Sequence, residues 1–345
     1  MLTASRAQIR SLLRRGEVIE IGGRPRKPSG PRTLHLLLAF AAIYLIWGST
    51  YLGIRYAVET IPPLLMMGTR HLAAGLMLYA WLRLRGTPAP LRMHWKGAAI
   101  AGGFFFLGSH GSLAWAEQRV PSGLAALLCA TLPLWIVLMT RLRGEKRHLS
   151  APVLGGLLLG FVGVAILIGP AALETGSRSS LLYAGVVLMG AFLWAIGTMY
   201  TQHATLPSSS SLSAAMQMIA GGVILWVAGL VTGERVHPAA ITGKSVLSLA
   251  YLIIFGSLIA FTAFTWLHKV SSPTRNSTYA YVNPVVAVFV GWFFAGEEVG
   301  IRTIVATAII VAGVALVNRG KEASPHERKP DIAALELAEQ EMSAD

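Results

Sequence analysis

The segment LLMMGTRHLAAGLMLYAWL, residues 64–82, decides how the rest of the chain is interpreted. As a helix it is long enough to cross a bilayer, which takes about 20 predominantly apolar residues. Arg70 and His71 nevertheless lie side by side within it. A charged side chain facing lipid costs from ~3 to more than ~10 kcal/mol, so Arg70 must face protein or water. The segment therefore predicts a helix bundle with a polar interior.

Residues in and around this segment recur in the second half of the chain. Trp47, Gly75 and Gly86 recur at a constant offset as Trp194, Gly222 and Gly233, and the same offset pairs Arg70 with Gln217. Further matches are Gly108-Ser109 with Gly256-Ser257, Thr131-Leu132-Pro133 with Val282-Asn283-Pro284, and Gly144-Glu145 with Gly296-Glu297. The pattern predicts a duplicated chain that keeps one polar residue deep in a helix of each copy.

Composition indicates a helical membrane protein. Charged residues make up 13% of the chain and hydrophobic residues 54%, and soluble domains carry about twice that charge content. The formal charge of +13 lies in tails and alternate short loops, as membrane topology requires, so nucleic acid is not predicted as a partner. The single cysteine, Cys129, excludes an intrachain disulfide, and no metal-ligand spacing is present.

We predict an all-α integral membrane protein with ten transmembrane helices, at residues 34–54, 64–82, 97–116, 121–140, 151–173, 181–201, 210–231, 245–267, 276–295 and 301–317. They form two five-helix repeats, 34–173 and 181–319, between a basic N-terminal tail (1–33) and a C-terminal tail (320–345). The distribution of Lys and Arg places both tails in the cytoplasm. The basic tail is either a short helix on anionic membrane lipids or a solvated segment.

An odd number of helices in each repeat makes the second copy enter the membrane upside down. The loop charges agree, because Arg141, Arg143, Lys146 and Arg147 follow the fourth span, whereas Glu297 and Glu298 follow the ninth. Two inverted repeats around a central cavity are the plan of secondary transporters that work by alternating access.

Three motifs carry a family resemblance: IWGSTY at 46–51, VPSG at 120–123 leading into ATLP at 130–133, and YAYVNP at 279–284. With ten spans in two halves, the chain resembles the EamA family of the drug/metabolite transporter superfamily over residues 34–319. The resemblance implies an exporter in a bacterial inner membrane. It is almost silent on the solute, because family members are associated with amino acids, other metabolites and drugs.

Two titratable side chains at depth are candidates for function. Arg70 is either a structural arginine bonded to a neighbouring helix or a contact for a solute carboxylate, which suits its fixed fork of donors. His110, in the third span, is either a hydrogen-bonded packing residue or a proton relay. Coupling of transport to protons is left open by the sequence, as is the oligomeric state.

The predicted cavity has an aromatic lining, because ring faces with polar tips hold partly apolar solutes. Its predicted members are Tyr44, Trp47, Tyr51, Trp115, Trp194, Tyr279 and Tyr281, joined by the polar Arg70, His110, Gln217 and Asn283. Pro133 and Pro284 lie at matching positions in spans 4 and 9 and predict helix kinks there, either as hinges or as static bends.

The sequence argues against an enzyme, because no aspartate precedes Asp331 and nothing clusters carboxylates for a metal ion. No cofactor is predicted. The deep titratable groups Arg70, His71 and His110 are neutral or cationic, whereas Glu59, Glu117 and Glu234 lie at span ends or in loops. This favours a zwitterionic, neutral or carboxylate-bearing solute, with amino acids first; a multidrug exporter of broader range is the alternative, and a passive channel a weaker one.

Overall fold

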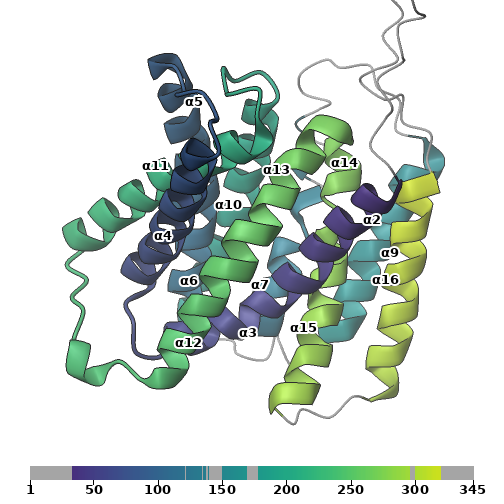
Figure 1. The fold of residues 1–345 in the computed structure, drawn as a ribbon. Coiled ribbons are helices and arrows are strands. Elements are labelled where there is room, and N and C mark those ends of the chain that lie inside the picture. Colours follow the sequence, from purple (N-terminus) through teal and green to yellow (C-terminus); the bar gives the residue numbers. More distant parts are fainter. Residues whose placement is uncertain are drawn as a thin grey trace, which may run out of the picture. The chain divides into compact units, whose positions relative to one another are not determined.

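The computed structural model describes residues 33–120, 122–133, 135–136, 139, 150–168, 178–295 and 300–319. The chain divides into two compact units, residues 1–36 and 37–345, and of the first only residues 33–36 are described. The described residues form helices and connecting segments, without a strand (Figure 1). The predicted tails, and the two loops whose charges motivated the inversion, lie outside the described residues.

Helices fall where the apolar segments predicted them. In the first half they are α2 (Thr33–Ala41), η1 (Ala42–Ile46), α3 (Trp47–Ala57), α4 (Pro63–Leu84), α5 (Arg92–Gly102), η2 (Gly103–Gly111), α6 (Ser112–Ala116), α7 (Ser122–Cys129) and α9 (Ala151–Ile168). In the second half they are α10 (Arg178–Thr201), α11 (Ser210–Val231), η4 (Pro238–Ala240), α12 (Gly243–Tyr251), η5 (Leu252–Ile259), α13 (Ala260–Val270), α14 (Pro273–Asn276), α15 (Tyr279–Ala295) and α16 (Ile301–Arg319).

By length and composition, four helical runs among the described residues can cross a membrane: Thr33–Ala57, Leu182–Thr201, Ser210–Val231 and Gly243–Val270. α9, α15 and α16 contain shorter apolar stretches. α4 spans 22 residues, but Arg70 and His71 lower its mean hydropathy. Helix is thus present in each predicted span, and the crossing of the bilayer by all ten remains a prediction.

The ends of α4 and α11 explain part of the sequence repeat. Both helices are followed by a glycine at the same distance, Gly86 and Gly233, with φ of 83° and 82°. This left-handed conformation closes a helix and favours glycine, which has no Cβ to clash. The two glycines recur at the same offset in the sequence because each ends a helix at the same position of the predicted repeat.

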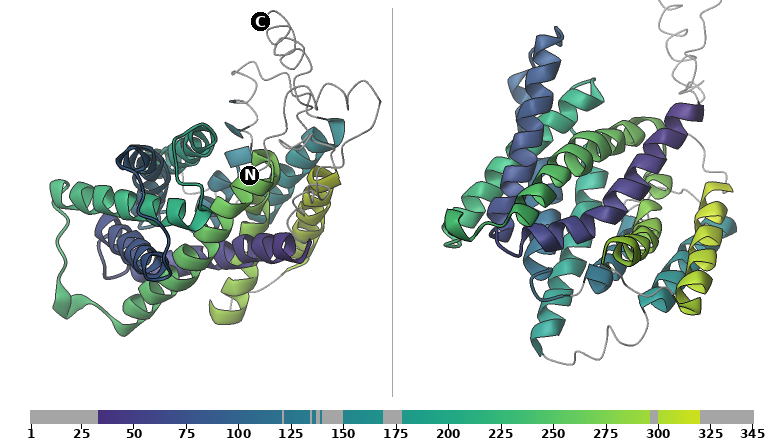
Figure 2. Two further views of the ribbon diagram at one scale, coloured as in Figure 1. Left: turned by 45° about the horizontal axis from the view of Figure 1, so that its top comes forward. Right: turned by 60° about the horizontal axis from the view of Figure 1, so that its bottom comes forward.

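The two most extensive helix contacts bring backbones together, and each joins the two halves of the chain. α4 lies against α11, where a Cβ on Gly75 would be 2.8 Å from Ile219 N. α9 lies against α16, where a Cβ on Gly156 would be 2.6 Å from Gly313 O. Figure 1 and Figure 2 show α9 and α16 side by side in every view. Small residues permit this close approach, as in other membrane helix pairs.

The remaining packing is mirrored between the two halves. α3 packs against α12, η5 and α15 of the second half. α10, the predicted repeat equivalent of α3, packs against α5, η2 and α7 of the first half. The helices touched by α10 thus include the predicted equivalents of those touched by α3.

Three segments, η1, η2 and η5, are π-helical. Such segments are rare and occur often at functional sites. η2 and η5 lie in equivalent spans and contain the matching Gly108-Ser109 and Gly256-Ser257. Span 4 is also irregular, because α7 ends at Cys129 and a turn at 130–131 precedes the buried Pro133. Proline has no N–H for the carbonyl of Cys129, which accounts for this break. Pro284, by contrast, lies inside α15.

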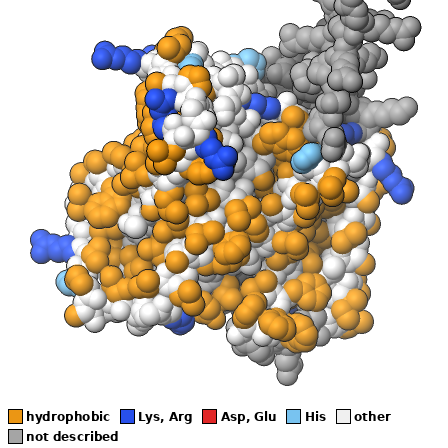
Figure 3. Space-filling model, viewed as in Figure 1, with side chains coloured by type: hydrophobic (Ala, Val, Ile, Leu, Met, Phe, Trp, Pro, Cys, Tyr) orange, Lys and Arg blue, Asp and Glu red, His pale blue; other side chains and the backbone are white. Residues whose placement is uncertain are grey.

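The surface of the 37–345 unit is largely apolar. Figure 3 shows hydrophobic side chains across most of one face, with Lys and Arg toward its edges. Large exposed apolar residues include Leu84, Val231, Leu247, Phe293 and Phe294. Apolar exposure on this scale marks a surface that is covered by a partner or by lipid.

Candidate functional site: a central cavity and two flanking cavities

A small cavity of about 70 Å³ lies among helices of both halves. α3, α4, η2, α6, α7, α10 and α15 all contribute to its wall. Of the residues predicted from the sequence, it brings together Trp47, Tyr51, Arg70, His110, Trp194, Tyr279 and Asn283. Ligand pockets typically hold roughly 300–1,000 Å³, so this conformation admits water but is too contracted for an amino acid.

Arg70, one of the residues that line this cavity, carries a donor without a partner. Its side chain is 1% exposed; Nε donates to Ser257 Oγ at 2.9 Å, and Nη1 donates to Met67 Sδ at 3.7 Å. Nη2 has no hydrogen-bond partner. A Cβ on Gly256 would lie 2.6 Å from Nη2, so a glycine is required beside the guanidinium. A buried charged donor without a partner is costly unless something binds it.

A chain of hydrogen bonds runs from Arg70 through the two histidines. Ser257 Oγ lies 3.4 Å from His71 Nδ1, and His71 Nε2 lies 2.9 Å from His110 Nδ1. The two imidazoles are stacked, with centroids 5.0 Å apart. Because one ring must donate to the other, the tautomers of His71 and His110 are coupled, and Nε2 of His110 takes no part in this bond. This geometry suits both a packing histidine and a relay.

Two tryptophans at equivalent positions meet in the wall of the cavity. Trp47 and Trp194 pack edge to face with ring centroids 5.7 Å apart, and Tyr279 packs on Trp47 at 4.9 Å. Trp47 Nε1 donates to the carbonyl of Gly256, in the π-helical segment η5, at 2.9 Å. Trp194 Nε1 has no hydrogen-bond partner. The pair differs in this bond and in its ring neighbours, because Trp47 packs on Tyr279 whereas Trp194 packs on Phe105 and His110.

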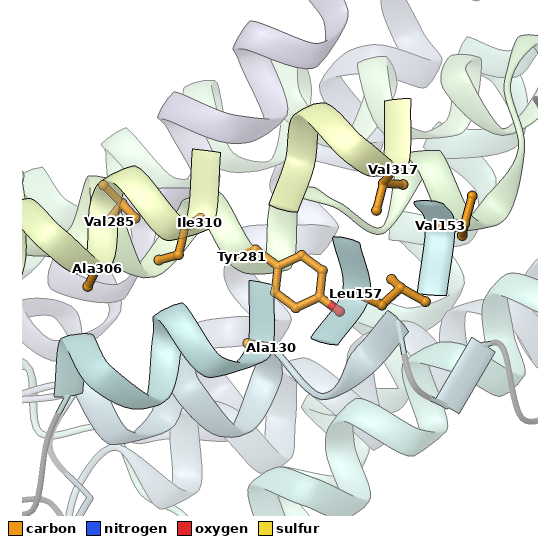
Figure 4. Close-up of a cluster of buried hydrophobic side chains, with 8 residues drawn as sticks. All are labelled: Ala130, Val153, Leu157, Tyr281, Val285, Ala306, Ile310 and Val317. Carbon is orange, nitrogen blue, oxygen red and sulfur yellow. The ribbon is translucent and has the colours of Figure 1, made fainter. Parts of the chain in front are cut away.

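Four residues predicted to line the substrate cavity lie elsewhere. Tyr44 bonds Thr278 Oγ1 through its hydroxyl at 2.7 Å, and Trp115 packs on Tyr183 with centroids 4.6 Å apart. Tyr281 belongs to an apolar cluster between α9, α15 and α16 (Figure 4). Two residues along a helix turn by about 200°, so Tyr281 faces away from the cavity that Tyr279 lines. Gln217 lines a separate, second cavity.

The second cavity, of about 380 Å³, lies beside α11 and is lined by η2, α13 and the segment after α10. Rings that line it pack directly on rings of the central cavity. Phe105 lies 4.7 Å from Trp194, and Phe264 lies 5.0 Å from Trp47, both between centroids. These four rings, which we call the aromatic partition, separate the two spaces.

The third cavity, of about 550 Å³, is lined by Glu117, one of the carboxylates that the sequence places at span ends or in loops. Glu117 caps the C-terminus of α6, is 6% exposed, and has no partner on either carboxyl oxygen. Burial raises its pKa well above the ordinary value, while the charges of Arg55 and Arg70 act in the opposite direction. Glu117 lies at the end of the third span, as expected from the sequence, but its burial was not predicted. The sequence around Glu117, which comes two residues after Trp115, does not indicate that its side chain is buried.

Helices with an apolar exterior around a small polar and aromatic cavity define a polytopic membrane protein. The chain belongs to the EamA-like transporter family, whose model matches residues 34–169 and again residues 181–319. It is 38% identical, over 88% of its length and 96% of the relative's, to YedA of Escherichia coli (strain K12), an uncharacterized inner membrane transporter. The transporter YoaV of Bacillus subtilis (strain 168) is 25% identical over 81% of this chain and 95% of its own.

A protein of known crystal structure shares the fold, with a TM-score of 0.68 over 83% of this chain and 96% of its own. At 22% identity this likeness concerns the fold alone. Membership of the family confirms the resemblance drawn from the sequence motifs. It also confirms that the chain is a membrane transporter and not an enzyme.

Proposed function

We propose that this protein exports small metabolites, such as amino acids or related zwitterionic, neutral or carboxylate-bearing solutes, by alternating access. The observation that carries the proposal is that Arg70, which lines the central cavity, has no partner for its Nη2. A guanidinium held by Ser257 and missing one partner is a preformed site for a carboxylate. The tryptophan pair supplies the apolar surface for the rest of the solute.

The proposed architecture is ten spans in two inverted repeats, in a bacterial inner membrane with both termini cytoplasmic. The mirrored packing and the two glycine-lined pairs, α4 with α11 and α9 with α16, support it. Reporter fusions at Arg319 and in the loop after Glu297 test it, with cytoplasm and periplasm as the expected results. The same side for both fusions would overturn the topology.

Because the central cavity is contracted, transport requires it to widen toward one side at a time. The helix pairs with interlocked backbones are suited to move as rigid bodies, whereas the π-helical segments η2 and η5 and the break in span 4 are suited to deform. A rocking movement of helices around a fixed site needs both kinds of element, helix pairs that stay rigid and segments that deform.

The test of the solute is uptake into inside-out vesicles, which present the cytoplasmic face. We expect labelled amino acids to enter in wild type and to lose most of that uptake in Arg70→Gln, while a quaternary ammonium dye is transported poorly by both. Robust dye transport unchanged by the substitution would defeat the proposal.

A second candidate function, export of organic cations, is favoured by Glu117. This buried carboxylate is close enough to feel the charge of Arg70 and has no hydrogen-bond partner. If cations are the solute, Glu117→Gln abolishes dye transport and Arg70→Gln does not. The two substitutions thus separate the two candidates in one assay.

A further inference from the structure

The second cavity has the size and polarity of a solute site, although the sequence pointed only to the central one. Its volume of about 380 Å³ lies within the usual range for small-ligand pockets. It lies beside α11 and is reached from the segments 202–209 and 268–269, which the proposed topology places in the cytoplasm. Solute leaving the cell would meet this cavity before the central one.

Two buried acceptors in this cavity lack a donor. Gln217 is 2% exposed; its Nε2 donates to Ser213 Oγ at 2.8 Å, and its Oε1 has no partner. His268 Nδ1 donates to the carbonyl of Phe264 at 2.9 Å, so Nε2 of the neutral ring carries a lone pair, and it also has no partner. Both residues line the cavity, and together they call for a group with several N–H donors.

A single cation completes the described lining. Lys269 Nζ donates to the carbonyl of Pro207 at 3.3 Å and to that of Ser208. These neutral carbonyls leave the charge of Lys269 without an anion, and none of the lining residues is Asp or Glu. The cavity therefore offers neutral acceptors to a positive group and a fixed cation to a negative one.

We propose that the second cavity is a loading site for a small zwitterion, with an ammonium group bound by Gln217 and His268 and a carboxylate bound by Lys269. An α-amino acid has this chemistry. The aromatic partition then separates the loading site from the central cavity, and the solute passes it when the rings of Trp47, Phe105, Trp194 and Phe264 part. This inference rests on the proposed function and adds a site with one-sided access.

The test compares transport from the two faces of the membrane. The probe is a tritiated mixture of the protein amino acids, offered to inside-out and to right-side-out vesicles. In Gln217→Leu and in Lys269→Met we expect the half-saturation concentration to rise about tenfold from the cytoplasmic face. From the opposite face we expect wild-type values, because there the solute reaches the central cavity first.

Matched variants keep the result interpretable. Lys269→Arg retains the cation and should restore most of the affinity, and Lys244→Met removes a lysine paired with Glu59 outside the cavity and should change nothing. The melting temperature of each variant checks folding, and Lys269 is exposed enough to be replaced without a packing defect.

The outcomes are distinct. If Arg70→Gln loses transport while both cavity variants keep wild-type half-saturation from the cytoplasmic face, the proposed function stands and the loading site is wrong. An equal rise from both faces would also overturn it. If wild type takes up none of the mixture, the loading site and the proposed function fall together.

Discussion

Arg70 and Gln217 occupy equivalent positions in the predicted repeat but face different cavities. They lie on α4 and α11, which pack directly against each other, and they are 1% and 2% exposed. Each leaves one polar atom without a partner, Nη2 of Arg70 and Oε1 of Gln217, and Arg70 lines the central cavity whereas Gln217 lines the second. The two positions of the predicted repeat are thus both buried and polar, but Arg70 lacks an acceptor and Gln217 lacks a donor.

The difference arises in the neighbouring helices. The guanidinium of Arg70 lies against Gly256 of η5 and donates a hydrogen bond to Ser257 of the same segment, whereas Gln217 donates to Ser213 on its own helix. Gly108, the equivalent of Gly256, contacts Leu193 instead of a polar group, since a Cβ there would lie 3.0 Å from Leu193 Cδ1. Repeat equivalence therefore identifies where polar residues are buried, but the facing helix decides what they bind.

The largest effect is expected from Arg70→Gln, which makes the two positions chemically alike. Loss of a charge-assisted hydrogen bond, worth about 1.5–3 kcal/mol, should lower kcat/KM for a carboxylate-bearing solute roughly 10- to 100-fold. The melting temperature should not fall, because the substitution also removes an unpaired buried charge. The exposed Arg302→Gln is the control. Full activity of Arg70→Gln would place Arg70 in a structural role.

A smaller loss is expected from Gly256→Ala, which keeps Arg70 but displaces it. The added Cβ would lie 2.6 Å from Nη2, so the guanidinium must shift. Uptake assays should show kcat/KM reduced by about tenfold, since sites tolerate little misplacement of a positioned charge. Gly103→Ala, in the π-helical η2 and with nothing within 4 Å of the new atom, should transport as wild type. Similar losses in both variants would trace the effect to the π-helices.

The helices could be predicted from the sequence because the apolar runs are long and clearly ended. Pro63 begins α4, and Gly86 and Gly233 close α4 and α11. The same offset that paired these glycines also paired Trp47 with Trp194, whose rings are in contact. The residues that recur in the sequence thus occupy corresponding places in the fold.

Rotation of each helix about its axis could not be predicted in the same way. A membrane helix is apolar on both its lipid and protein faces, so no amphipathic stripe marks the inner side. Tyr281 was therefore assigned to the cavity with Tyr279, and Gln217 was placed with Arg70 although it lines a separate space. The burial of Glu117 was missed because it depends on packing around the end of α6.

The pH dependence of stability provides a test at Glu117, whose pKa is affected by the charge of Arg70. Its pKa is raised by burial, so the unfolded chain releases the proton at lower pH than the folded protein. Its contribution to stability is complete below the unfolded pKa and is lost as pH rises through the folded pKa. We expect wild type to lose melting temperature as pH rises above about 4.5, and Glu117→Gln to lose less. Parallel curves for the two proteins would mean that Glu117 is ionised and paired.

The smallest effect is expected from the tryptophan pair, in which the indole N–H groups differ by one hydrogen bond. Trp47→Phe removes the bond from Nε1 to the Gly256 carbonyl, whereas Trp194→Phe removes an N–H that has no partner. Leaving that carbonyl unbonded should cost Trp47→Phe about 1 kcal/mol more than Trp194→Phe in unfolding free energy. Denaturation of both purified variants in the same detergent measures the difference. Because Gly256 also borders Arg70, we further expect Trp47→Phe to be the more impaired in transport. Equal stability and equal transport would show that the two halves meet symmetrically here, and that the asymmetry begins only at Arg70 and Gln217.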